Sequence, residues 1–196
     1  MSATAETLDP ATFVQSYIVT KYKKEIEAWG KSAIPEELIS ILKDLRAPKA
    51  AFAEISIILA EGILPAIELR HPGDLRPRRA LEAAKVYFNK DTEDNAKAVT
   101  EAIDHAFKAE AEATGHAESA AAAYAICYAA RASCARNIEE ASNNAAWTAY
   151  YATATFRIKA SYDAVEATSA VLNQQHILDV IRKVGRKHFA FLNKAK

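Results

Sequence analysis

The stretch AESAAAAYAICYAARASC, residues 117–134, carries the pattern that determines the fold. Nine of its eighteen residues are alanine, the strongest helix former, and neither proline nor glycine interrupts it. Spacings of four and three residues place one set of positions on a single helix face, which we predict as a helix–helix seam. The set is Ala113, Ala117, Ala120, Tyr124, Cys127, Arg131 and Cys134.

The following helix offers a matching narrow face. Small side chains let two helix backbones approach closely, so we expect the two segments to pack together across a turn region at 136–144. The expected face consists of Ala145, Ala149, Ala152 and Phe156. The seam can close within one chain or between two copies, so a homo-oligomer stays open as an alternative.

The composition of the 196 residues points the same way, with 43 alanines, five glycines and six prolines. No period-two alternation marks a strand face, which argues against an all-β fold. All six prolines fall at or before residue 77, so we expect short helices first and long helices after. The sequence predicts one all-α domain over 1–196, an Ala-rich antiparallel bundle or short helical stack of seven or eight helices.

Helix start and stop signals divide the chain further. We expect Pro65 to kink its helix, Asp74 and Thr92 to cap the helices that follow them, and Gly185 to be a weak point before a basic tail. The expected helices include 10–30, 35–47, 49–70, 75–88, 93–114 and 171–192.

Charge and compartment signals are weak. Lys plus Arg equals Asp plus Glu at 25 each, so the chain lacks the long-range field that drives non-specific nucleic-acid binding. Residues 1–10 do not resemble a signal peptide, and the longest apolar run, 120–130, is short of a membrane span, so we expect a cytoplasmic protein without a membrane partner. Cys127 and Cys134, about 10 Å apart along a helix, are expected to stay reduced.

Motifs for catalysis and metal binding are scarce. Glu68 and His71 form the single Glu-x-x-His pair, whereas a helical di-metal site needs two. Glu101 with His105, and Glu112 with His116, could hold a metal, but their spacing is also that of ordinary exposed charge pairs, which we favour. The sequence has no glycine-rich phosphate loop, nucleophile elbow, His-Glu-x-x-His or Cys-x-x-Cys. We therefore expect no cofactor or metal, and an enzyme is the least favoured interpretation.

The segment DLRPRR, residues 74–79, places three arginines in the first turn of a helix, where they oppose the helix dipole. Arg76 and Arg79 can pair with Asp74, Glu82 or a neighbouring carboxylate. Alternatively, the turn is a bidentate site for an acidic partner or a phosphate. We expect a mixture, with Arg76 structural and Arg78 available to a partner.

Two further groups have both a structural and a functional interpretation. An aromatic stripe is typical of core, but its Tyr and Trp residues are also those that dominate binding interfaces. It consists of Tyr124, Tyr128, Trp147, Tyr150, Tyr151 and Phe156. A basic C-terminal group complements a helix dipole or contacts an acidic partner or nucleic acid. That group consists of Arg182, Lys183, Arg186, Lys187, His188, Lys194 and Lys196.

The run AEGILPAIELRHPGDLRPRRALEAA, residues 60–84, resembles the signature of immunity proteins from bacterial polymorphic-toxin systems, of the immunity-five type. In that family an Ala-Glu-x-x-Leu-Pro helix leads into a His-Pro-x-Asp-x-Arg-Pro-Arg turn, and a later Gly-His-Ala step resembles 115–117. The resemblance covers about 38–184, with 1–31 as an added N-terminal helix and 185–196 as the basic tail.

The resemblance implies a non-catalytic, all-helical protein that binds and neutralises a cognate toxin or effector. The runner-up hypothesis is a phage- or defence-associated binder of a small phosphorylated or nucleotide-like ligand. The candidate binding residues are His71, Asp74, Arg76, Arg78, Arg79, His116, Tyr124, Trp147 and Tyr150.

Overall fold

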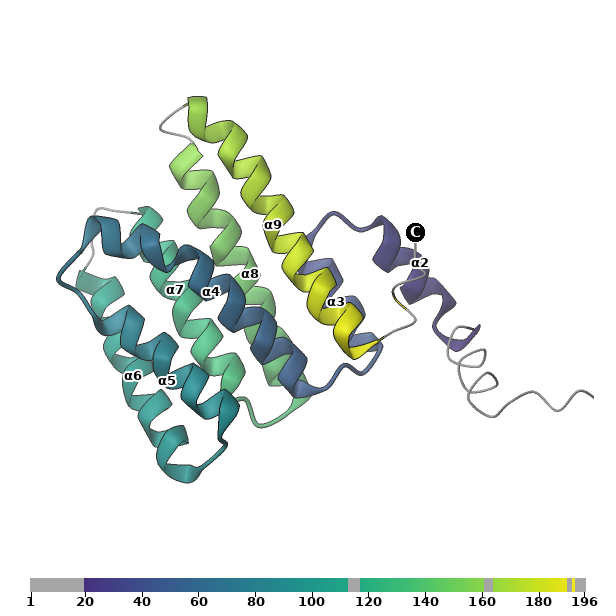
Figure 1. The fold of residues 1–196 in the computed structure, drawn as a ribbon, viewed down its shortest axis with the longest axis horizontal. Coiled ribbons are helices and arrows are strands. Elements are labelled where there is room, and N and C mark those ends of the chain that lie inside the picture. Colours follow the sequence, from purple (N-terminus) through teal and green to yellow (C-terminus); the bar gives the residue numbers. More distant parts are fainter. Residues whose placement is uncertain (1–19, 113–116, 161–163, 190–191, 193–196) are drawn as a thin grey trace, which may run out of the picture.

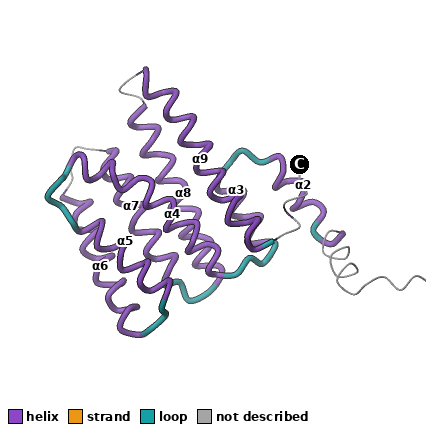
Figure 2. The backbone as a smooth tube through the Cα atoms, in the orientation of Figure 1, coloured by secondary structure: helices purple, strands orange, loops and turns teal. Residues whose placement is uncertain are grey.

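The computed structural model describes residues 20–112, 117–160, 164–189 and 192, without the side chains of 109–112, 159–160 and 164–173. These residues form helices and contain no strand, which confirms the all-α prediction (Figure 2). The helices are α2 (Lys23–Lys31), α3 (Pro35–Asp44), α4 (Lys49–Arg70), α5 (Arg76–Asn89), α6 (Glu93–Glu112), α7 (Ala117–Ser133), α8 (Ile138–Ala160) and α9 (Ala164–His188).

Helices α7 and α8 form the central pair of the fold (Figure 1). Helix α4 packs against both of them, α5 and α6 pack on the α7 side, and α3 and α9 pack on the α8 side. Helix α2 packs against α3 at the far end. The core is therefore continuous from α6 to α2 through the alanine-rich pair.

The crowding around α7 follows from its small side chains. Twelve of its seventeen residues are buried, because alanines let α4, α5, α6 and α8 all approach it closely. The seam predicted along α7 is wrong in its direction: Ala117 and Arg131 are exposed, Ala120 and Tyr124 are half-buried, and only Cys127 lies in the core. The predicted seam is thus the outward ridge of the helix, half-buried Cys134 lies just past its end, and Ala113 lies outside the described residues.

The predicted counterpart on α8 is confirmed, since Ala145, Ala149 and Ala152 are fully buried. The turn between the two helices is shorter than the predicted 136–144, because α8 already begins at Ile138. The Oδ1 atom of Asn137 accepts the Glu140 N–H at 2.9 Å and so caps the helix early.

Helix α4 has the predicted bounds and continues through Pro65. By length and composition it is the one helix in the described part of the chain that could cross a membrane, with a mean hydropathy of 1.8 over its most apolar window. That window is 61% buried among the other helices, as in the core helix of a folded domain. The two cysteines are free, as predicted.

Gly185 is not the weak point that was predicted, because α9 continues through it to His188. A Cβ atom at Gly185 would lie 2.5 Å from Cη2 of Trp29, so the missing side chain makes room for the indole ring. Trp29 is 1% exposed and belongs to the main core cluster. This contact holds α2 against α9; residues 10–19 of the predicted first helix lie outside the described part.

Candidate functional site

The arginine turn is largely satisfied within itself. Oδ1 of Asp74 accepts the backbone N–H of Arg76 at 3.0 Å and its Nε at 2.9 Å, while Oδ2 accepts Nη2 at 2.8 Å. Asp74 thus caps α5 as predicted, although the helix boundary places it one residue before the cap position, Leu75. These hydrogen bonds from Arg76 lower the pKa of the Asp74 carboxyl. Arg76 is structural, as predicted.

Arg78, which we expected to be available to a partner, is exposed but also forms an ion pair within the fold. Its Nε and Nη2 donate to the two carboxylate oxygens of Glu68, at 2.7 and 2.8 Å. The last turn of α4 brings Glu68 against the first turn of α5, which the spacing within α5 alone could not indicate. Arg79 is also exposed, and unlike Arg78 it forms no ion pair with any residue that the structure describes.

Arg79 borders a cleft of about 430 Å³ between α5 and α6. Arg76, Glu101 and His105 line the same cleft, so the predicted Glu101–His105 pair faces the arginine turn. Half-buried His71 follows α4 in the turn, and its charge contributes to the lowered pKa of Asp74. His116 lies outside the described residues. Within the described part of the chain, His, Cys, Asp and Glu form no group that could hold a metal ion.

The aromatic stripe forms a surface across α6, α7 and α8. We call it the aromatic face; it consists of Phe107, Tyr124, Tyr128, Trp147, Tyr150 and Tyr151. Tyr124 and Tyr128 stack on Tyr151 with ring centroids 5.0 and 5.7 Å apart, and Trp147 stacks on Tyr128 at 5.9 Å. Tyr150 meets Trp147 and Tyr151 edge to face. The rings therefore hold one another in fixed orientations.

The interpretation of this stripe as core is wrong for its outer members. Trp147 is 47% exposed and Tyr150 is 51% exposed, because they lie on the side of α8 turned away from its buried alanines. Phe156, by contrast, is half-buried and packs against the core. All three predicted aromatic site residues, Tyr124 included, lie in the aromatic face.

Phe107 and Arg131 were not predicted from the sequence to belong to this region. The guanidinium of Arg131 lies 4.7 Å from the ring centroid of Phe107 and 5.7 Å from that of Tyr128. It forms no ion pair with a described residue, so it places a positive charge on the aromatic face that no described carboxylate pairs with. The helical spacing of Tyr124, Tyr128 and Arg131 was the available signal, but it was assigned to packing.

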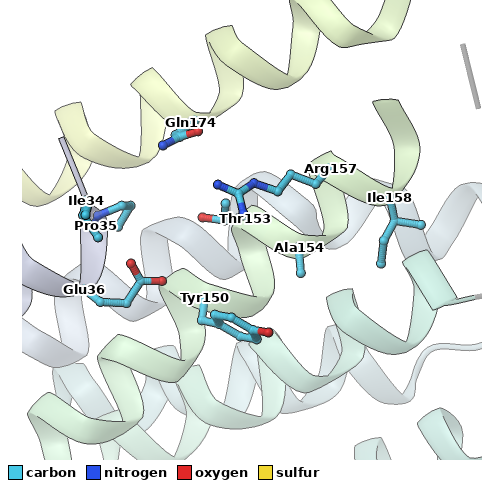
Figure 3. A pocket seen from close by; sticks show the side chains of 9 residues that line it. All are labelled: Ile34, Pro35, Glu36, Tyr150, Thr153, Ala154, Arg157, Ile158 and Gln174. Carbon is cyan, nitrogen blue, oxygen red and sulfur yellow. The ribbon is translucent and has the colours of Figure 1, made fainter. Parts of the chain in front are cut away.

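A second cleft, of about 540 Å³, opens between α3, α8 and α9 (Figure 3). We call it the charged cleft; Tyr150, at the edge of the aromatic face, forms part of its wall. Glu36, Arg157 and Gln174 supply its polar lining. None of these three residues was predicted, because they come from helices far apart in the sequence.

The basic C-terminal group is partly paired within the fold. Lys187 Nζ contacts both oxygens of Glu54 at 2.8 and 2.9 Å, and His188 lies 3.6 Å from the same carboxylate. Arg182 donates to the Ser32 carbonyl at 2.8 Å. These contacts favour the structural interpretation of this group. Lys194 and Lys196 lie outside the described residues.

Comparison with protein-family models, curated proteins and solved structures gave no match to this chain. The resemblance to immunity proteins rests on residues 60–84 and 115–117, in which Asp74 pairs with Arg76 and Glu68 pairs with Arg78.

Proposed function

We propose that the protein is a non-catalytic, protein-binding module of the immunity type, which docks a toxin or effector on the aromatic face. The observation that carries this proposal is the exposure of Trp147 and Tyr150 on rings that are already stacked in place. Trp, Tyr and Arg are the residues that most often dominate the binding energy of protein–protein interfaces.

Preorganisation strengthens this argument. Binding costs free energy when flexible side chains must be ordered, and rings that already stack have little freedom left to lose. The guanidinium of Arg131, which has no ion-pair partner among the described residues, adds a cation to the same surface. The face therefore fits a protein partner whose surface combines apolar groups with carboxylates.

The signature motif has a different part in this proposal. Asp74 pairs with Arg76, and Glu68 pairs with Arg78, so these two pairs stabilise the corner between α4 and α5. The motif supports the immunity-type assignment through resemblance, whereas the proposed docking surface for the partner lies mainly on α7 and α8.

A second candidate function is the binding of a small phosphorylated ligand. The cleft between α5 and α6 favours it, since Arg79 has no described ion-pair partner there and Arg76 and His105 lie on the same wall. Glu101 in that cleft opposes an anion. We therefore rank this function below protein binding.

The test is a capture experiment followed by binding measurements with the purified partner. Trp147→Ala and Arg131→Ala should each weaken binding while circular dichroism shows an intact fold, the tryptophan change by about 2 kcal/mol, or roughly thirtyfold. Leu69→Ala, at an apolar position of α4 that is 78% exposed, is the matched control and should leave affinity unchanged.

Unchanged affinity for the captured partner after Trp147→Ala would refute the aromatic face as the docking surface. Thermal stabilisation by inorganic phosphate or a nucleotide that disappears in Arg79→Ala would favour the second candidate instead.

A further inference from the structure

The charged cleft contains two opposite charges that do not neutralise each other. Glu36 lies in the first turn of α3, and Arg157 lies near the end of α8. Neither side chain forms an ion pair with the other or with any further residue in the described ranges. Both charged ends point into the space beneath Gln174 of α9 (Figure 3).

We propose that the charged cleft binds a small zwitterion, an amino acid or dipeptide carrying a free ammonium and a free carboxylate. The Glu36 carboxylate would accept from the ammonium group. The Arg157 guanidinium, with the Gln174 amide beside it, would donate to the carboxylate. The cleft shares Tyr150 with the aromatic face, but its charged groups, Glu36 and Arg157, lie outside that face.

Charge complementarity selects this class of ligand over simple ions. An anion alone would be attracted by Arg157 but repelled by Glu36. A cation alone would be attracted by Glu36 but repelled by Arg157. A molecule with both charges satisfies both walls at once and stays neutral overall. The two protein charges border one cleft without touching, which leaves a ligand room to lie between them.

The remaining walls suit a ligand with an apolar side chain. Ile34, Pro35, Ala154 and Ile158 supply apolar surface, and the Tyr150 ring closes one side. The volume of about 540 Å³ falls within the usual range for small-molecule sites and exceeds the needs of a single small amino acid. A dipeptide with one aliphatic side chain is therefore the first probe.

The test uses the dipeptide alanyl-leucine and two capped forms of it, titrated to about 20 mM into the full chain, because half-exposed ion pairs give weak binding. N-acetyl-alanyl-leucine lacks the ammonium, and alanyl-leucine amide lacks the free carboxylate. Amide chemical shifts from nuclear magnetic resonance report both affinity and location. We expect the free dipeptide to shift amides around Glu36 and Arg157 and to bind about fivefold more tightly than either capped form.

Two variants that each remove one protein charge test which ligand group binds Glu36 and which binds Arg157. In Glu36→Gln the free and N-acetylated dipeptides should bind equally, and in Arg157→Gln the free and amidated dipeptides should bind equally. Arg136→Gln, on the loop before α8 and with a side chain 89% exposed, is the control and should change neither comparison.

The proposal is overturned if the capped dipeptides bind as tightly as the free one, or if none of the three shifts amides near Glu36 and Arg157. Loss of binding to a protein partner in Trp147→Ala is a separate result, since Trp147 does not line the cleft.

Discussion

Replacing Gly185 with alanine tests whether Trp29 is packed against α9. The added Cβ would meet Cη2 and Cζ2 of Trp29 at 2.5 and 2.8 Å and Cδ2 of Leu42 at 3.1 Å. Carbon atoms prefer separations of about 3.5–4.0 Å, so the ring would have to move. At 1% exposure, Trp29 cannot move without disturbing the core. Overpacking of this kind costs about 1–3 kcal/mol of unfolding free energy.

Helix propensity acts in the opposite direction. Alanine is about 1 kcal/mol better than glycine inside a helix, so Gly185→Ala should destabilise the protein by a net of roughly 0–2 kcal/mol. Trp29→Ala alone should cost about 3–5 kcal/mol. In that background the steric conflict with the ring is absent, and adding Gly185→Ala should now stabilise the protein by about 0.5–1 kcal/mol.

The control is Gly62→Ala in α4, where an added Cβ meets no atom within 4 Å. This change should stabilise the protein by about 0.5–1 kcal/mol in both backgrounds. Urea unfolding followed by far-ultraviolet circular dichroism gives all the required free energies. The reasoning is refuted if Gly185→Ala stabilises the otherwise unchanged protein as much as Gly62→Ala does.

Three further predictions concern side-chain pairs. Asp74→Asn should lower the unfolding free energy by about 1 kcal/mol at neutral pH. Because the pKa of Asp74 is lowered in the folded state, the stability difference between the variant and the unchanged protein should disappear as the pH falls through that pKa, which thermal melts would measure. A hydrogen bond with Asp91, together with burial, raises the pKa of Tyr87 to about 12, so stability present below pH ~10 should be lost as the pH rises toward 12. Asp91→Asn should lower the pKa of Tyr87 toward its ordinary value, which a phenol titration followed by ultraviolet absorbance would measure. Arg78→Ala should cost no more than about 1 kcal/mol in chemical denaturation, since its pair with Glu68 is half-exposed, and a larger loss would mean a buried role.

Local signals in the sequence predict the helices best where those signals are strong. Proline at the start of α3 and the threonine before α6 place those boundaries correctly, and Thr92 Oγ1 accepts the Asn95 N–H at 3.3 Å as expected for a cap. The start of α8 was missed because the stretch 136–144, which ends in Asn143 and Asn144, was interpreted as a turn region. The capping residue is Asn137, and the two later asparagines lie within the helix.

Periodicity indicates which residues share a helix face, but not whether that face lies inside. On α7 the conspicuous face with Tyr124 and Arg131 is outward, because alanines on all other sides can be buried at little steric cost. The same limit applies to the clefts. Glu36 and Arg157 line one cleft through the packing of α3 on α8, and no spacing within either segment encodes that arrangement.

The crowding around α7 also affects how this protein can evolve. A larger side chain at a fully buried alanine such as Ala125 or Ala129 would push a neighbouring helix away, so most changes there should be lost with the fold. The outward ridge at Ala120, Tyr124 and Arg131 is free of that constraint. Recognition of a new partner can therefore be acquired along one narrow line of α7, while the scaffold that presents it stays unchanged.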